Sequence, residues 1–314
     1  MGLSHAFILC AGYGTRMGEI GKILPKLMWP IFEKKMLEAQ VLYARSLGCR
    51  RIFINSHYLH EQIQSFVSKK NWDDVILVHE PVLLDMGGGI CNVATYPELQ
   101  DVEQLLILNG DQFYLFDHSF LEEASKELGD SKALLFGIKV PANSGYNATI
   151  VKDGRLVAIE AGNGKAEDYL TYSGVGLINL KRLNKIAGPS RFFDTIAPYK
   201  TDSVLMRTPG DCEYWDFGTI SRYHQSMFRL MSDATENPRG KFVSFCKQEG
   251  ILNFKKISRD KNAYGQERWK NTIKLGEGEI LNYEAVQAIC LGDEGGVSVE
   301  GNGIYFSGIF DPLV

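Results

Sequence analysis

A glycine-rich turn with two basic side chains close behind it is the part of this sequence best suited to chemistry. Gly12 and Gly14 directly follow an apolar run, Arg16 comes two residues later, and Lys26 precedes a second apolar segment. Glycine lets the backbone approach a ligand closely, and successive N–H groups in such a turn bind anions. A Gly-x-Gly turn alone is often only structural, but the two cations make the pattern specific. The spacing predicts a phosphate-binding loop over residues 9–26, called the phosphate loop below.

The elements around this loop alternate in a regular way over the first 140 residues. Amphipathic segments at residues 36–47 and 59–67 lie among short apolar runs rich in β-branched and aromatic side chains. The apolar runs are residues 6–10, 51–55, 75–79, 104–108 and 133–140. Such alternation is typical of βαβ units with crossover helices. We expect a Rossmann-like, doubly wound parallel sheet here, with ligands bound outside the carboxyl ends of its strands.

The pattern changes after residue 140. Residues 148–151 and 156–160 flank an Asp-Gly turn signal, so we expect antiparallel strands that make the sheet mixed. A strand over 174–179 should precede a helix from about Leu180, and a longer helix should cover 221–231. Residues 232–240 are polar and rich in helix breakers, which places a domain boundary near residue 235.

Residues 236–314 form the second predicted part of this α/β protein, a small β-rich extension. It contains many glycines and an alternation of apolar and polar residues at 296–300. It shows no hexapeptide period of the kind that predicts a left-handed β-helix. Packing on domain 1–235 and contact between subunits of a homo-oligomer are both open as its role.

Composition narrows the classes of partner. The chain has 314 residues, 45% of them hydrophobic, and a formal net charge of −4. It therefore lacks the basic field that draws proteins to nucleic acids or anionic membranes, and we expect neither partner. The absence of a leader-like amino terminus and of 18 uninterrupted apolar residues indicates a cytoplasmic protein. The six cysteines lie far apart without a metal-ligand spacing, which favours reduced, structural thiols.

Several stretches together resemble the signature of the sugar nucleotidyltransferase, or nucleoside-diphospho-sugar pyrophosphorylase, family. They are LCAGYGTRM at 9–17, PKLMWPI at 25–31, LDMGGGI at 84–90, NGD at 109–111, PAN at 141–143, YSGVG at 172–176 and WDFGT at 215–219. The resemblance covers residues 3–231 and leaves the extension unexplained. It implies the nucleotide-diphospho-sugar transferase fold, with a catalytic domain at 1–235.

The resemblance also implies a reaction and its residues. A sugar 1-phosphate oxygen attacks the α-phosphorus of a nucleoside triphosphate and expels pyrophosphate, with Mg²⁺ as the cofactor. The matched positions assign catalysis to Arg16 and Lys26; nucleotide binding to Leu9, Ala11, Gly12, Gly14, Thr15, Gly88, Gly89 and Asp111; sugar binding to Asn143, Glu160 and Gly174; and the metal to Asp111 and Asp216. These roles suit the chemistry, because cations and N–H donors stabilise the charge that develops on the leaving pyrophosphate.

Structural interpretations compete with these assignments. Asp111 could cap a helix, Asp216 could lie in a surface turn, and residues 84–90 could form a flexible turn that opens a helix at Ile90. His57 and His60 are better explained by capping and surface packing than by metal binding.

The substrates are less determined than the reaction. Residues 84–90 and 172–176 resemble uridylyltransferases acting on N-acetylmuramate 1-phosphate slightly more than mannose 1-phosphate guanylyltransferases. A cytidylyltransferase acting on another phosphorylated acceptor and a non-catalytic protein that binds sugar nucleotides remain alternatives. A Rossmann dehydrogenase is disfavoured, because the third glycine of its fingerprint is missing after Gly14.

Overall fold

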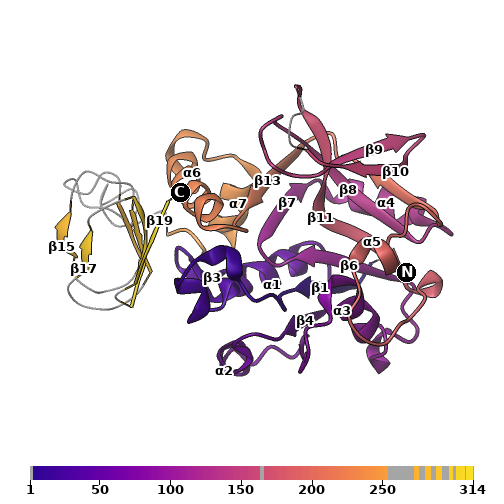
Figure 1. The fold of residues 1–314 in the computed structure, drawn as a ribbon, viewed down its shortest axis with the longest axis horizontal. Helices are drawn as coiled ribbons and strands as arrows, with labels where there is room; N and C mark the ends of the chain where they lie inside the picture. Colours follow the sequence, from indigo (N-terminus) through magenta and orange to yellow (C-terminus); the bar gives the residue numbers. More distant parts are fainter. Residues whose placement is uncertain are drawn as a thin grey trace. The chain divides into compact units, whose positions relative to one another are not determined.

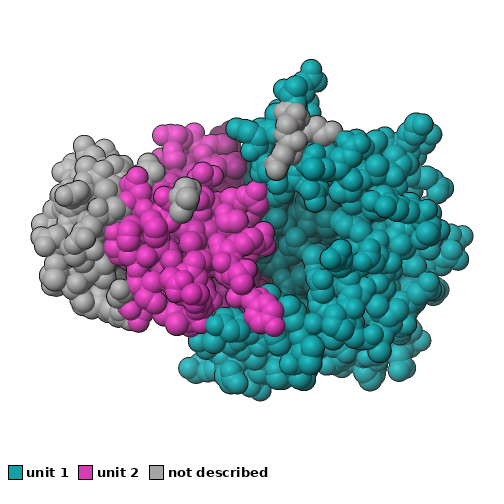
Figure 2. All heavy atoms as spheres, viewed as in Figure 1, with its two compact units in different colours: residues 1–12, 43–214 teal, residues 13–42, 215–314 magenta. Residues whose placement is uncertain are grey.

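The computed structural model of the chain divides into two compact units, coloured separately in Figure 2. Unit 1 consists of residues 1–12 and 43–214, and unit 2 of residues 13–42 and 215–314. The residues that the structure describes are 3–162, 166–253, 272–275, 280–283, 288–291, 297–299, 302–307 and 309–313. The chain first passes from one unit to the other inside the phosphate loop, directly after Gly12.

A nine-stranded mixed sheet forms the frame of unit 1, in the order β5-β4-β1-β6-β11-β8-β12-β10-β9 (Figure 1). The strands are β1 (His5–Leu9), β4 (Arg51–Ser56), β5 (Val75–His79), β6 (Gln104–Asn109), β8 (Ala133–Val140), β9 (Ala148–Lys152), β10 (Arg155–Glu160), β11 (Tyr169–Asn179) and β12 (Val204–Arg207). Strand β1 pairs in parallel with β4 and β6, whereas β11 runs antiparallel between β6 and β8. The predicted α/β fold with a mixed sheet is confirmed.

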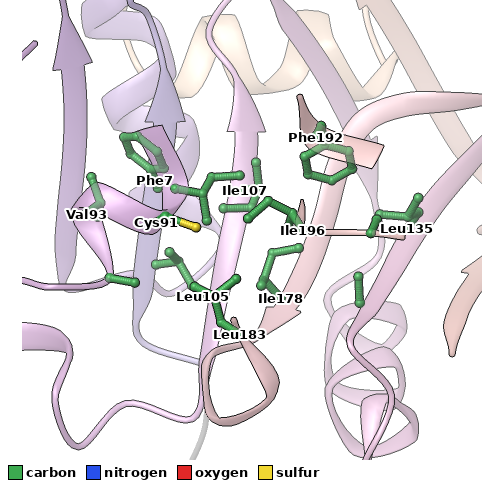
Figure 3. Close-up of a cluster of buried hydrophobic side chains, with 14 of the residues drawn as sticks. Phe7, Cys91, Val93, Leu105, Ile107, Leu135, Ile178, Leu183, Phe192 and Ile196 are labelled. Carbon is green, nitrogen blue, oxygen red and sulfur yellow. The ribbon is translucent and has the colours of Figure 1, made fainter. Parts of the chain in front are cut away.

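Helices of unit 1 pack on this sheet and bury its apolar side chains. They are α2 (His60–Lys70), α3 (Asp85–Val93), α4 (His118–Leu128) and α5 (Phe192–Thr195), with a 3₁₀ turn η4 (Pro97–Leu99). Figure 3 shows Phe7 of β1 and Ile107 of β6 in one cluster with Cys91 of α3 and Phe192 of α5. Burial of each large apolar side chain stabilises the fold by about 1.5–3 kcal/mol, so the cluster fixes β1 and β6, which carry candidate site residues at their ends.

Two predicted elements after residue 179 are wrong in extent. The helix expected from about Leu180 is only a three-residue 3₁₀ turn, η5 (Leu180–Arg182). Gly188 with φ of +88° and the proline after it prevent a helix from continuing toward α5. The helix expected at 221–231 is longer, because α6 (Ile220–Glu236) includes the first residues of the segment taken as breaker-rich. None of the described helices combines the length and apolar character that a membrane span needs.

Unit 2 contains the second half of the phosphate loop, a pair of helices and a β-rich region. Its elements are η1 (Thr15–Met17), η2 (Ile20–Lys22), η3 (Lys26–Met28), β2 (Pro30–Ile31), β3 (Lys34–Lys35), the first part of α1 (Met36–Ser46), α6, α7 (Lys241–Gln248), β14 (Thr272–Lys274), β15 (Ile280–Tyr283), β16 (Ala288–Cys290), β17 (Val297–Val299), β18 (Gly303–Phe306) and β19 (Ile309–Pro312). Strand β7 (Gln112–Phe116) belongs to unit 1, and β13 (Cys212–Asp216) leads from unit 1 into unit 2.

The β-rich character of the extension is confirmed, and its topology is a parallel coil. Strands β14, β16 and β18 pair in parallel in one ladder, and β15 and β17 pair in parallel in a second. Successive strands therefore alternate between the two ladders, as in a β-solenoid. The strands begin at residues 272, 280, 288, 297 and 303, so they do not recur at a fixed hexapeptide spacing and no repeat period was visible in the sequence. Strand β19 closes the coil by pairing antiparallel with β18.

Candidate functional site

The carboxyl ends of the parallel strands of unit 1 bring several predicted residues to one edge of the sheet. Leu9, the last residue of β1, is the register partner of Asn109, the last residue of β6. The N–H group of Gly110 donates a 3.1 Å hydrogen bond to the carbonyl of Leu9. The start of the phosphate loop therefore lies beside Asp111, as expected for ligand-binding residues of an open α/β sheet.

Asn55, at the end of β4, holds the backbone where the phosphate loop leaves β1. Its Oδ1 atom accepts hydrogen bonds from the N–H groups of Cys10 at 2.7 Å and Ala11 at 3.3 Å. Its Nδ2 group donates to Oε1 of Glu80 at 2.8 Å, and Oε2 of Glu80 accepts from the N–H group of Leu84 at 3.1 Å. This buried pair links the phosphate loop to the glycine-containing segment 84–90. Neither Asn55 nor Glu80 was predicted from the sequence, where the available signal was a polar side chain at the end of an apolar strand.

Burial also sets the ionisation of Glu80, which is 1% exposed. Desolvation raises the pKa of its carboxyl above the ordinary value, while the hydrogen bonds from Asn55 and Leu84 oppose this rise. The neighbouring histidines have structural roles. His57 Nδ1 lies 2.7 Å from the carbonyl oxygen of Glu80, and His60 stacks on His79 at a centroid distance of 3.9 Å.

The glycines of segment 84–90 lie inside helix α3, which begins at Asp85 and not at Ile90. Asp85 itself has φ of +58°. The N–H groups of Gly87 and Gly88 both donate to the carbonyl of Ser190, at 2.8 and 3.2 Å.

Close packing explains why these positions are glycines. A Cβ atom on Gly88 would lie 2.3 Å from the carbonyl oxygen of Gly188, and one on Gly89 would lie 2.9 Å from Oε1 of Glu80. Contact of Gly88 and Gly89 with a nucleobase stays a prediction.

Asp111 lies in the turn between β6 and β7, partly exposed. It precedes a strand, so the interpretation of Asp111 as a helix cap is wrong. The next residue, Gln112, accepts a 2.8 Å hydrogen bond from Asn109. Gly174 packs against this pair with φ of +83°, and a Cβ atom there would lie 2.2 Å from Oε1 of Gln112. Glycine at 174 thus gives room to the turn that carries Asp111.

The other two predicted sugar ligands lie on separate elements of unit 1. The exposed Asn143 is in the loop between β8 and β9, and the exposed Glu160 ends β10. Strand β11 fixes the loop of Asn143, because the Tyr169 hydroxyl donates to the carbonyl of Tyr146 at 2.6 Å and the Thr171 hydroxyl to that of Asn147 at 2.7 Å.

In unit 2, the phosphate loop continues as a tight backbone turn. Gly14 adopts φ of +65°, and its carbonyl accepts from the N–H group of Met17 at 2.8 Å. Met17 is fully buried, whereas Thr15 and Arg16 are exposed. The turn therefore presents a hydroxyl and a guanidinium to solvent on a backbone anchored by Met17, an arrangement suited to binding an anion.

Lys26 and Asp216, both in unit 2, meet at one turn. The Lys26 ammonium donates a 3.1 Å hydrogen bond to the carbonyl of Gly218, whose N–H group donates to Oδ1 of Asp216 at 2.6 Å. Oδ2 of Asp216 forms a 3.0 Å ion pair with Arg222 in the first turn of α6. Asp216 is the last residue of β13 and is 8% exposed, so the interpretation of Asp216 as a surface turn is wrong. Arg222 was not predicted from the sequence.

A divalent cation fits the chemistry of the predicted ligands. Mg²⁺ is usually held by one or two carboxylates together with substrate phosphates. Asp111 in unit 1 and Asp216 in unit 2 each carry carboxylate oxygens, and the binding of one ion by both stays a prediction. Within the described ranges, no group of three or more His, Cys, Asp and Glu side chains is arranged to hold a metal by itself. Additional ligands for Mg²⁺ would come from the phosphate groups of the substrate.

Comparison with known proteins gives one family model, the MobA-like NTP transferase domain, which matches residues 6–155. A D-glycero-alpha-D-manno-heptose 1-phosphate guanylyltransferase from Campylobacter jejuni is 32% identical over 134 residues, 42% of this chain and 56% of that protein. A putative mannose-1-phosphate guanyltransferase from Sulfolobus acidocaldarius is 23% identical over 76% of this chain and 66% of that protein. The matched part thus spans less than two thirds of either relative.

Solved structures share the fold. The crystal structure of HddC from Yersinia pseudotuberculosis has a TM-score of 0.63 and 21% identity, and covers 73% of this chain and 100% of that one. The same protein complexed with GMP-PN gives a TM-score of 0.62.

Proposed function

Since the chain belongs to the sugar nucleotidyltransferase family, with a MobA-like NTP transferase domain over residues 6–155, we propose that it transfers a nucleotidyl group from a nucleoside triphosphate to a sugar 1-phosphate. The observation that carries the proposal is the register of Leu9 with Asn109, because it supports a phosphate loop beginning beside the carboxylate of Asp111. The relatives are named as guanylyltransferases of sugar 1-phosphates, which supports the same reaction class for this chain.

Each candidate residue has a defined task in this reaction. The N–H group of Gly14, the Thr15 hydroxyl and the Arg16 guanidinium bind the β- and γ-phosphates and stabilise the pyrophosphate as it leaves. Gly12, whose own N–H group donates to the carbonyl of Cys10 at 2.9 Å, lets the backbone approach these phosphates closely. Lys26 neutralises the repulsion between the attacking sugar phosphate and the α-phosphate, and holds the two in line.

The metal and sugar sites complete the proposal. Asp111 and Asp216 would hold Mg²⁺, which when bound offsets phosphate charge. Arg222 must share Asp216 with that ion, because the two residues form an ion pair. Asn143 and Glu160 bind sugar hydroxyls, and Gly174 leaves space for the sugar ring.

The identity of the two substrates is a finer proposal. Two relatives are named as guanylyltransferases of heptose and mannose 1-phosphates, and the structural neighbour HddC was also solved in complex with GMP-PN. These names favour GTP and a heptose or mannose 1-phosphate as the substrate pair. UTP with N-acetylmuramate 1-phosphate, favoured by residues 84–90 and 172–176, stays a prediction. The net charge of −4 keeps nucleic acids and anionic membranes outside the expected partners.

Pyrophosphate release with Mg²⁺ tests the proposal. All four nucleoside triphosphates should be combined with the 1-phosphates of D-glycero-D-manno-heptose, mannose, N-acetylmuramate, glucose and N-acetylglucosamine. Release that requires one particular pair supports the function and names its substrates. Choline phosphate is added as a further acceptor, and release only from CTP with this phosphorylated alcohol would indicate the cytidylyltransferase alternative. Binding of nucleotide and sugar nucleotide without release from any pair would favour a binding protein instead.

A further inference from the structure

The strand that closes the coil places a buried carboxylate against the phosphate loop. Asp311 of β19 is 4% exposed, and its Oδ1 and Oδ2 atoms accept 2.8 Å hydrogen bonds from the backbone N–H groups of Glu19 and Ile20, respectively. All three residues belong to unit 2. Hydrogen bonds to an ionised acceptor are shorter and about twice as strong as neutral ones. The carboxylate therefore fixes the backbone that leads into η2.

Gly18 fits this carboxylate closely. It ends η1, the turn that contains Thr15 and Arg16, and adopts φ of +59°. A Cβ atom at this position would lie 2.4 Å from Oδ1 of Asp311. The absence of a side chain at Gly18 therefore lets the carboxylate of Asp311 approach the loop closely.

The rest of the phosphate loop is closely packed. A backbone shift at Gly18 would therefore also move the turn that carries Thr15 and Arg16. A Cβ atom on Gly21 would lie 2.8 Å from the carbonyl oxygen of Gly14 and 2.7 Å from Cβ of Met17. Met17 and Ile20 are fully buried. Gly14, Met17 and Gly21 therefore form one tightly packed turn, whose residues must move together.

Asp311 is itself held in place by strand β18. Ile304 of β18 is its register partner, and the Tyr305 and Phe310 rings stack at a centroid distance of 4.5 Å. The N–H group of Leu313 donates to the carbonyl of Asn302 at 3.0 Å. The β18–β19 hairpin is thus a firm support for the carboxylate.

We propose that Asp311 is a positioning residue of the phosphate loop, and that the β18–β19 hairpin serves the nucleotide site by holding residues 18–20. The proposal rests on the proposed function, since it assigns the extension a role in binding the triphosphate. Loss of the carboxylate releases two N–H groups and lets the turn that carries Thr15 and Arg16 relax. Affinity for the triphosphate then falls, while affinity for the sugar 1-phosphate does not.

The test compares Asp311→Asn with Glu236→Gln, a matched loss of one negative charge at the exposed end of α6. For Asp311→Asn we expect the KM for the nucleoside triphosphate to rise about 10-fold, with the KM for the sugar 1-phosphate unchanged. Glu236→Gln should match the wild type. Hydrogen–deuterium exchange should show faster exchange in the segment containing Glu19 and Ile20 for Asp311→Asn only. An unchanged exchange rate, or faster exchange with an unchanged triphosphate KM, would overturn the proposal.

Gly18→Ala covers the case in which Asp311→Asn does not fold, and a double-mutant cycle with Asp311→Ala tests whether both act through the same contact. Gly18→Ala places a methyl group against the carboxylate and should raise the triphosphate KM in the same way. Combining it with Asp311→Ala removes the clash, so the two effects should be less than additive. Strict additivity would contradict action through Gly18. If the wild type releases no pyrophosphate at all, the proposed function fails, whereas the exchange experiment still decides whether Asp311 holds the loop.

Discussion

The Lys26 ammonium group lies 3.1 Å from the carbonyl oxygen of Gly218, the residue whose N–H group is bound by Asp216. A lysine from the phosphate loop and a predicted metal ligand at the end of β13 are thereby connected through a single turn of unit 2. The hydrogen bond to this carbonyl orients the ammonium group of Lys26. Its action on phosphate groups stays a prediction.

Replacing Lys26 should abolish most of the activity without loss of folding. We expect Lys26→Ala to lower kcat/KM by about 100-fold or more, the usual effect of removing one group that stabilises the transition-state charge. Lys22→Ala is a suitable control, since Lys22 is a solvent-exposed lysine of the same loop that forms an ion pair with Glu19. Initial rates of pyrophosphate release measure both. Equal rates for Lys26→Ala and the wild type would remove Lys26 from the mechanism.

Metal dependence should separate Asp216 from its partner Arg222. Asp216→Asn removes a charged ligand, so the Mg²⁺ concentration for half-maximal rate should rise at least about 10-fold. Arg222→Met removes the competing cation and should lower that concentration. Mg²⁺ titrations at saturating substrates give both values. A rise in both variants would mean that Asp216 acts only through its ion pair with Arg222.

Gly174 should be intolerant of a side chain for a steric reason. Gly174→Ala puts Cβ 2.2 Å from Gln112 Oε1 at φ of +83°, whereas Gly188→Ala has φ of +88° and nothing within 4 Å. Both variants should lose about 1–2 kcal/mol from the left-handed backbone, and Gly174→Ala about 1–3 kcal/mol more from overpacking. Denaturant unfolding measures the difference. Equal losses of unfolding free energy in the two variants would show that the turn carrying Asp111 can shift to accommodate the added methyl group.

The buried carboxyl of Glu80 should make stability depend on pH. Burial raises the pKa of Glu80 in the folded state. The stability linked to the protonated carboxyl is therefore fully present below the ordinary carboxyl pKa. It is lost as the pH rises through the raised pKa. Glu80→Gln cannot ionise, so its free energy of unfolding should fall less over this interval. The difference is about 1.4 kcal/mol for each unit by which the pKa is raised. Unfolding curves that stay parallel from pH 4 to pH 8 would contradict this.

The sequence revealed what depends on local residue types. Gly14, Arg16 and Lys26 could be found because glycines and cations stand close together along the chain, and β1 and β6 because their apolar runs are short and β-branched. Asn55, Glu80 and Asp311 were missed, because each acts through hydrogen bonds to segments far away in sequence. Only a fold brings these partners together. The parallel coil was also missed, since its described strands begin at unequal intervals and show no hexapeptide period.

The fate of the α-phosphate tests the central claim most directly. A nucleoside triphosphate labelled at the α-phosphorus should be incubated with Mg²⁺ and the sugar 1-phosphate identified in the panel, using the wild type and Lys26→Ala. The account predicts that the wild type moves the label into a nucleoside diphosphate sugar, with one pyrophosphate released for each product, and that Lys26→Ala does not. Label recovered as nucleoside monophosphate, or an equal yield of sugar nucleotide from Lys26→Ala, would contradict it.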